Sequence, residues 1–123
     1  TDATPVETFR QRFQIIQEYA HQGGRDPSKF DSCLHLMVNI NNDRDEAYKE
    51  AEVFLTSYYG AGAISRERAE LWLAYGPPEA VIEKIQAYID AGCTTPVLRF
   101  VSPDLSGQLQ RCIEEVLPAF RVK

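Results

Sequence analysis

Apolar and polar residues alternate with a period of two over residues 33–41, which predicts a β-strand. One face of this strand is purely apolar and carries Leu34, Leu36, Val38 and Ile40. The other face is mixed and becomes polar toward its carboxyl end, with Cys33, His35, Met37, Asn39 and Asn41. A second strand is predicted over residues 96–101, where Leu98 and Phe100 lie opposite Val97, Arg99 and Val101.

Apolar residues elsewhere recur at steps of three and four, the spacing of amphipathic helices. Five helices are predicted, starting near Pro5, Asp43, Ser65, Pro77 and Asp104. In the first helix, the buried face is predicted to carry Val6, Phe9, Phe13, Ile16 and Ala20. In the last helix, it is predicted to carry Leu105, Leu109, Ile113, Val116 and Phe120.

Strands that alternate with amphipathic helices indicate an α/β fold with parallel strands. Residues 1–123 contain no linker and no low-complexity stretch, so they form a single segment. Two parallel strands alone do not make a stable sheet that helices cover on both faces. A closed eight-stranded barrel takes about 250 residues. We therefore expect the C-terminal β/α repeats of a TIM (β/α)8 barrel, whose other strands come from a missing N-terminal part or from another copy of this chain.

Composition limits the classes of partner and compartment. Lys and Arg number 13 and Asp and Glu number 18, giving a net charge of −5 without a basic stripe, so nucleic acid is not expected as a partner. No apolar run approaches the roughly 20 residues that span a bilayer, and no signal peptide is visible. We expect no membrane partner and a cytoplasmic location. The first residue is Thr1, which suggests a processed chain or one cut from a longer protein.

Three cysteines, Cys33, Cys93 and Cys112, lie at wide spacing in or beside apolar segments. This spacing is neither that of a disulfide framework nor that of a zinc site. We expect all three to be buried or half-buried free thiols in a reducing compartment. No metal site is predicted.

Several short motifs, taken in order, resemble the C-terminal end of the luciferase-like monooxygenase family. They are YGPPE at 75–79, AYIDAG at 87–92, VLRF at 97–100 and EEVLPAFR at 114–121, preceded by GRDP at 24–27 and by a strand that ends on NND at 41–43. The similarity covers essentially the whole chain. The order and spacing of the motifs carry the resemblance, because each motif alone is weak.

The resemblance implies a TIM barrel that uses FMN or the deazaflavin coenzyme F-420, acting as a monooxygenase or oxidoreductase on a small organic substrate. It also implies that about two-thirds of a family member is absent from this chain, including most contacts to the flavin ring. We therefore expect the chain alone to be inactive.

In a barrel, ligands bind at the carboxyl ends of the strands. This rule selects Asn39 and Asn41 after the first strand, and Arg99 and Ser102 at the second, as candidate cofactor-binding residues. The Arg99 cation could contact a cofactor phosphate or an anionic substrate group, or it could pair with a carboxylate of a neighbouring strand. The two asparagines could bind a ligand, or they could hydrogen-bond the loop backbone or cap the next helix.

The catalytic residues are not identified from the sequence. His35 could donate a proton near a flavin, or it could be an interior residue in the middle of its strand. Two functions stay open: the C-terminal part of a flavin- or deazaflavin-dependent oxidoreductase, and a non-catalytic module that self-associates through its strand edges and binds flavin weakly or not at all. Both predict a homo-oligomer.

Overall fold

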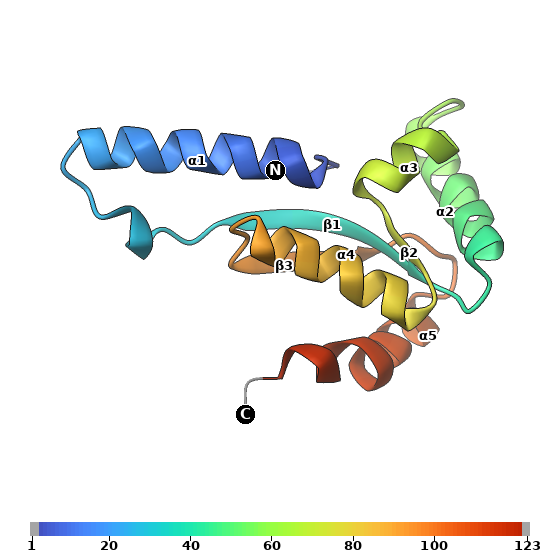
Figure 1. Cartoon of the computed structure of the whole chain (residues 1–123). Coiled ribbons are helices and arrows are strands. Elements are labelled where there is room, and N and C mark those ends of the chain that lie inside the picture. The colour runs from blue at the N-terminus through green and yellow to red at the C-terminus, as the bar shows by residue number, and fades with distance from the viewer. Residues whose placement is uncertain (1–2, 122–123) are drawn as a thin grey trace.

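A computed structural model of the chain describes residues 3–121 (Figure 1). Three strands are present: β1 (Cys33–Ile40), β2 (Ala74–Gly76) and β3 (Thr95–Phe100). The helices are α1 (Val6–Gln22), α2 (Arg44–Tyr59), α3 (Arg66–Trp72), α4 (Pro78–Asp90) and α5 (Leu105–Arg111). A 3-10 turn, Pro27–Lys29, precedes β1, and α5 continues into a π turn, Cys112–Val116, and a 3-10 turn, Leu117–Phe120.

The three strands form one parallel sheet in the order β2-β1-β3. Strand β1 pairs with β3 along its length, from Cys33 opposite Thr95 to Val38 opposite Phe100. It pairs with β2 only at its carboxyl end, where Val38, Asn39 and Ile40 lie opposite residues 74–76. The predicted α/β fold and its two parallel strands are confirmed. The short third strand was missed, because three residues are too few to give a periodic pattern.

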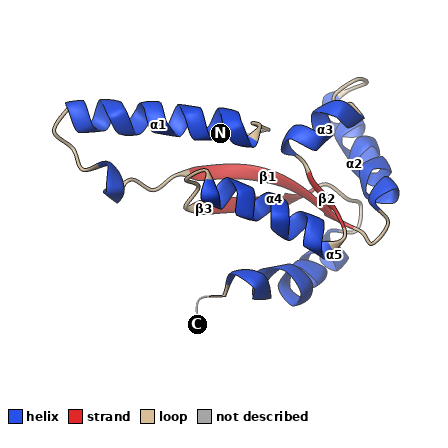
Figure 2. Cartoon of the chain, in the orientation of Figure 1, coloured by secondary structure: helices blue, strands red, loops and turns tan. Residues whose placement is uncertain are grey.

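The purely apolar face of β1 packs against α1, α4 and the C-terminal helix. Its four side chains join Phe9 of α1, Val81 and Tyr88 of α4, and Cys112 and Val116 in one buried cluster. Helix α4 lies between α1 and α5 in this layer (Figure 2). The layer therefore ends in α1 on one side and in the C-terminal helix on the other.

The other face of the sheet is covered only in part. Helices α2 and α3 pack over its carboxyl half, where Met37 and Val101 join Ala51, Leu55 and Trp72 in a second buried cluster. The side chains of the amino half, including Cys33, His35 and Val97, are exposed. This uneven cover is unusual, because all-parallel sheets are normally covered on both faces.

The predicted buried face of the last helix is wrong at three positions. Leu105, Leu109 and Ile113 are 54%, 52% and 47% exposed. The buried side chains are Gln108, Cys112 and Val116, which lie on a neighbouring stripe of the same helix. The helix has two apolar stripes, and spacing alone does not say which of them faces the sheet. In α1, Ile16 is likewise exposed, contrary to the prediction.

The cysteine prediction holds for two of the three thiols. Cys93 and Cys112 are free and buried, and burial raises the pKa of both thiols. Cys33 is free but exposed, because the face of β1 that carries it has no cover at that end. Within residues 3–121, none of the helices is long and apolar enough to cross a membrane.

Candidate functional site

The carboxyl ends of β1 and β3 lie side by side because the two strands are parallel and in register. Val38 is level with Phe100, and the Val101 amide continues the ladder by donating to the Val38 carbonyl at 2.9 Å. Two candidate residues, Asn39 and Ser102, therefore come to the same edge of the sheet although 63 positions separate them.

Asn39 is completely buried between the two strands and α2. Its Nδ2 donates to the Val101 carbonyl at 3.0 Å and to Glu50 Oε2 at 3.1 Å. Its Oδ1 is a buried oxygen for which no hydrogen-bond partner is found among the described residues. A buried amide with both protons used is held in a single orientation, since turning it over would bring its oxygen against two acceptors.

Ser102 is buried on the other side of the same carboxylate. Its hydroxyl donates to Glu50 Oε2 at 3.3 Å and accepts the Asp104 amide at 3.2 Å. Glu50 thus connects the ends of both strands through one oxygen. Sequence reasoning missed Glu50, whose only signal is a carboxylate at the border of the apolar face formed by Ala47, Ala51 and Leu55.

Asn41 shapes the loop that follows β1. Its Oδ1 accepts the Asp43 amide at 2.9 Å, and its own amide donates to the Gly76 carbonyl at 2.9 Å. Asp43 then caps α2 by accepting the amides of Asp45 and Glu46. Asn41 therefore takes the loop-forming role that the sequence allowed, and part of it still faces an open groove.

This groove lies at the strand ends and has a volume of about 380 Å³. Glu50, Ser102 and Asn41 line one side, and Gln108 and Arg111 of the last helix line the other. The Arg111 guanidinium forms two hydrogen bonds of 2.8 and 2.9 Å with Glu115, which raises the pKa of Arg111 and lowers that of Glu115. The Arg111 charge is thus already paired, while the donors to the Glu50 carboxylate within residues 3–121, Asn39 and Ser102, are neutral. Such a groove suits hydroxyl and N–H groups better than a phosphate.

Arg99 lies apart from this groove, on the partly covered face of β3. Its Nη1 donates to the Tyr59 hydroxyl at 2.9 Å, and its guanidinium lies 4.9 Å from the Tyr58 ring centre. Next to Tyr59 is an apolar cavity of about 310 Å³, lined also by Met37, Leu55 and Trp72. The structure therefore separates the candidates into a polar groove at the strand ends and an arginine beside an apolar cavity.

His35 is in neither place, since it lies in the exposed amino half of β1. Among residues 3–121, no group of three or more His, Cys, Asp or Glu side chains is arranged to hold a metal ion. The groove at the strand ends therefore offers the carboxylates of Glu50, Asp104 and Glu114, the Ser102 hydroxyl, amide groups and the Arg111 cation.

Solved structures share this arrangement of helices and parallel strands. An F420-dependent secondary alcohol dehydrogenase, in complex with an F420-acetone adduct, matches with a TM-score of 0.82 and 19% identity over 99% of this chain and 42% of its own. The long-chain alkane monooxygenase LadA matches with a TM-score of 0.64 and 24% identity over 98% and 36%. The riboflavin lyase RcaE, with modified FMN, matches with a TM-score of 0.66 and 16% identity over 96% and 35%.

The chain has the fold of part of a luciferase-like oxidoreductase. The resemblance seen in the sequence is thus confirmed at the level of the fold. No protein-family model and no curated protein matches the sequence. The chain spans less than half the length of the luciferase-like structures that it matches.

Proposed function

We propose that the chain is the C-terminal part of a flavin- or deazaflavin-dependent oxidoreductase, with its ligand site at the carboxyl ends of β1 and β3. The observation that carries this proposal is the meeting of Asn39 and Ser102 on Glu50 beside an open groove. Polar side chains gathered at the ends of parallel strands are the usual ligand site of α/β folds. Similar solved structures that contain an F420 adduct or a modified FMN support the class of cofactor.

The four candidate residues take different parts in this proposal. Asn41 and Ser102 line the groove and contact the polar part of the cofactor, while Asn39 acts through Glu50, which it holds in place. Arg99, beside the apolar cavity, faces a cofactor phosphate or an anionic substrate group. FMN and the deazaflavin F-420 remain the two candidate cofactors, and the substrate is a small organic molecule.

The test is cofactor binding by the protein expressed from its full coding sequence, compared with this chain alone. We expect the longer protein to bind FMN or F-420 and to lose affinity when Ser102 or Asn41 is changed to alanine. Gln86→Ala is the matched control, because Gln86 is an exposed residue of α4 whose side-chain amide donates to Asp90 on the same helix at 2.8 Å, away from the strand ends. Absence of binding of both cofactors to the longer, folded protein contradicts the proposal.

Arg99 permits a sharper test, because a phosphate contact distinguishes FMN from riboflavin. A hydrogen bond to a charged group contributes about 1.5–3 kcal/mol, or roughly 10- to 150-fold in affinity. If FMN is the cofactor and Arg99 contacts its phosphate, Arg99→Gln weakens FMN binding by about this factor and leaves riboflavin binding unchanged. An equal loss for both ligands would assign Arg99 to packing against Tyr58 and Tyr59.

A second candidate function is a non-catalytic module that self-associates. The observation that favours it is a stripe of exposed apolar side chains on the last helix, together with strand edges that have no partner within residues 3–121. It predicts a concentration-dependent dimer of the chain alone in sedimentation velocity, with no cofactor bound. A chain that stays monomeric at the highest concentration contradicts this alternative.

A further inference from the structure

The cavity between α2, α3 and β1 has an apolar base and an open side. Its volume is about 310 Å³. The base is formed by Met37 of β1, Leu55 of α2 and Trp72 of α3, which are all buried. Tyr59, at the end of α2, also lines the cavity and is 53% exposed, so it marks the side that opens to solvent. A molecule bound here has an apolar part in contact with the base and one end near solvent.

The open side carries a positive charge. Arg68 of α3 is the one charged residue among the described residues that line the cavity, and it is exposed. None of the ion pairs found within residues 3–121 involves Arg68. Arg66, two positions earlier in the same helix, pairs with Asp45 and lies over the Tyr48 ring. The two neighbouring arginines therefore differ, because only Arg66 has a carboxylate partner in the described part of the chain.

Tyr59 adds a second hydrogen-bond donor at the open side. Its hydroxyl oxygen accepts from Arg99 Nη1 at 2.9 Å, which leaves the hydroxyl proton to donate. A hydroxyl that accepts from a cation is polarised and becomes a stronger donor. A guanidinium and an O–H group beside an apolar base are the groups that recognise a carboxylate attached to an apolar body.

We propose that this cavity binds the substrate, and that the substrate is a small apolar molecule with a carboxylate at one end. The apolar body contacts the buried base, and the carboxylate accepts hydrogen bonds from Arg68 and Tyr59 at the open side. The inference rests on the proposed function, since it names the substrate class of that oxidoreductase. The volume is at the lower end of the roughly 300–1,000 Å³ of ligand pockets, so the body is as small as an aromatic ring with a short alkyl chain.

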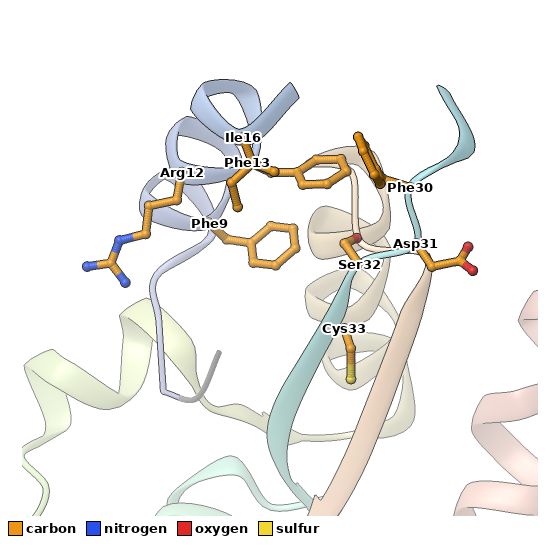
Figure 3. A pocket seen from close by; sticks show the side chains of 8 residues that line it. All are labelled: Phe9, Arg12, Phe13, Ile16, Phe30, Asp31, Ser32 and Cys33. Carbon is orange, nitrogen blue, oxygen red and sulfur yellow. The ribbon is translucent and has the colours of Figure 1, made fainter. Parts of the chain in front are cut away.

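A second apolar pocket lacks this combination of groups. It has a volume of about 220 Å³ and lies between α1 and β1, where the rings of Phe9, Phe13 and Phe30 turn toward the space (Figure 3). The Arg12 guanidinium points away from it (Figure 3), and Asp31, which also lines the pocket, is negatively charged. A carboxylate is therefore not favoured there. The groove at the strand ends is unfavourable for the same reason, because carboxylates line it.

The test is the binding of 3-phenylpropionate to this chain, compared with 3-phenylpropanamide and 3-phenylpropylamine. The three probes share the ring and the alkyl chain, and they carry a negative charge, no charge and a positive charge. Isothermal titration calorimetry measures the dissociation constants. We expect the acid to bind about tenfold more tightly than the amide or the amine, because it alone accepts charge-assisted hydrogen bonds. Equal binding of the acid and the amide overturns the proposal, as does absence of binding of the acid.

Trp72 shows where the probe binds, because it is the only tryptophan in the sequence. The chain labelled with 5-fluorotryptophan gives a single fluorine NMR signal, which should shift on titration with 3-phenylpropionate. Ala63→Leu should abolish both the heat of binding and the shift, since Ala63 lines the cavity and a leucine side chain fills it. A heat of binding without a shift of the Trp72 signal places the probe elsewhere and overturns the proposal.

Substitution of Arg68 tests the recognition of charge. Arg68→Gln should weaken binding of 3-phenylpropionate by at least about threefold and leave binding of the amide unchanged. Arg68→Lys should retain part of the preference for the acid, because it keeps the charge. Arg66→Gln is the matched control, since it removes the same charge from the same helix at a side chain that pairs with Asp45. Equal losses in Arg68→Gln and Arg66→Gln would mean that only the net charge matters, and would overturn the proposal.

Cofactor binding by the longer protein is measured separately, so this proposal and the proposed function can fail independently. Acid binding that depends on Arg68, with neither FMN nor F-420 bound by the longer protein, supports the carboxylate site and contradicts the proposed function. Cofactor binding without a preference for the acid over the amide supports the proposed function and overturns the carboxylate as the substrate class.

Discussion

Gln108 takes the place of a neighbouring strand at the end of β1. Its side-chain Oε1 accepts the Ile40 amide at 2.7 Å, and its Nε2 donates to the Ile40 carbonyl at 2.9 Å. Both bonds are buried, and they fix the start of α5 beside the strand ends. The shape of the groove with Glu50 and Ser102 therefore depends on Gln108, which holds α5 beside the end of β1.

Replacing Gln108 should destabilise the fold strongly. Gln108→Leu leaves the buried Ile40 amide without its acceptor, which costs about 1–3 kcal/mol, and leaves the Ile40 carbonyl with only the 3.3 Å bond from Arg111 Nη1 among the described residues. Urea unfolding followed by circular dichroism measures the loss. Gln110→Leu is the control, because Gln110 is exposed and should change the free energy of unfolding by less than about 0.5 kcal/mol. Similar effects of the two substitutions would contradict the structural role of Gln108.

Gly92 is the residue that ends α4 where the chain turns into β3. It has a φ of 110°, and a Cβ built there would lie 2.6 Å from Cδ1 of Phe13. An alanine at position 92 is disfavoured by this backbone angle, and its Cβ would also clash with the Phe13 ring. Gly92 therefore ends the helix and also allows α1 to pack closely against the turn.

Gly92→Ala should therefore lower the free energy of unfolding by more than an alanine substitution at a glycine that has a positive φ but free space around it. The strained φ costs about 1–3 kcal/mol, and overpacking against Phe13 adds about 1–3 kcal/mol. Gly62, with a φ of 78° and nothing within 4 Å of an added Cβ, is the matched control. Thermal unfolding of both alanine variants measures the difference, and equal losses would show that Phe13 moves aside at no cost.

At the scale of elements, period and spacing predicted most of the structure. Strands β1 and β3 and the five helices lie where alternation and apolar spacing placed them, and Asp43 and Ser65 cap α2 and α3. The short strand β2 could not be predicted from the sequence, since Ala74–Gly76 is defined by its pairing with β1 and has no alternating pattern of its own. The role of Glu50 could not be predicted either, because its hydrogen-bond partners Asn39 and Ser102 are 11 and 52 positions away in the sequence.

The last helix shows why a face cannot be chosen by spacing alone. Ile113 and Val116 both belong to apolar stripes, but only Val116 is buried. Val116→Ala removes two buried carbon groups at about 0.8 kcal/mol each and leaves a small cavity, so it should cost about 2 kcal/mol. Ile113→Ser should change the free energy of unfolding of this chain by less than about 0.5 kcal/mol. Chemical denaturation of both variants measures these losses. A larger loss of stability for Ile113→Ser would show that the face predicted from the sequence is the buried one.

At the scale of the whole molecule, a buried hydroxyl of α4 connects that helix to the segment that precedes α1. Tyr88 of α4 is fully buried and donates to the Thr4 carbonyl, just before α1, at 2.6 Å. Its ring also meets the edge of Phe9. The sequence could not predict this bond across 84 positions, because nothing in the local pattern relates the two segments.

Tyr88 should make the stability of the chain sensitive to alkaline pH. Burial raises the pKa of Tyr88 to about 12, because the phenolate is poorly solvated in the core, whereas an unfolded tyrosine ionises near 10. The unfolded state therefore loses this proton first. The contribution of Tyr88 to the free energy of unfolding is complete below pH 10, falls as the pH rises from about 10 to about 12, and is lost above that range.

The measurement is urea unfolding at a series of pH values between 9 and 11.5, on the parent chain and on Tyr88→Phe. One proton difference between the two states corresponds to about 1.4 kcal/mol per pH unit. Tyr88→Phe should flatten the decline above pH 10 by up to about that slope. Part of the decline should remain, because burial also raises the pKa of Tyr48 and Tyr75. Tyr19→Phe is the control, because Tyr19 is exposed on α1 and its replacement should leave the decline in stability unchanged. If Tyr88→Phe also leaves the decline unchanged, ionisation of Tyr88 does not weaken the contact between α4 and the segment before α1.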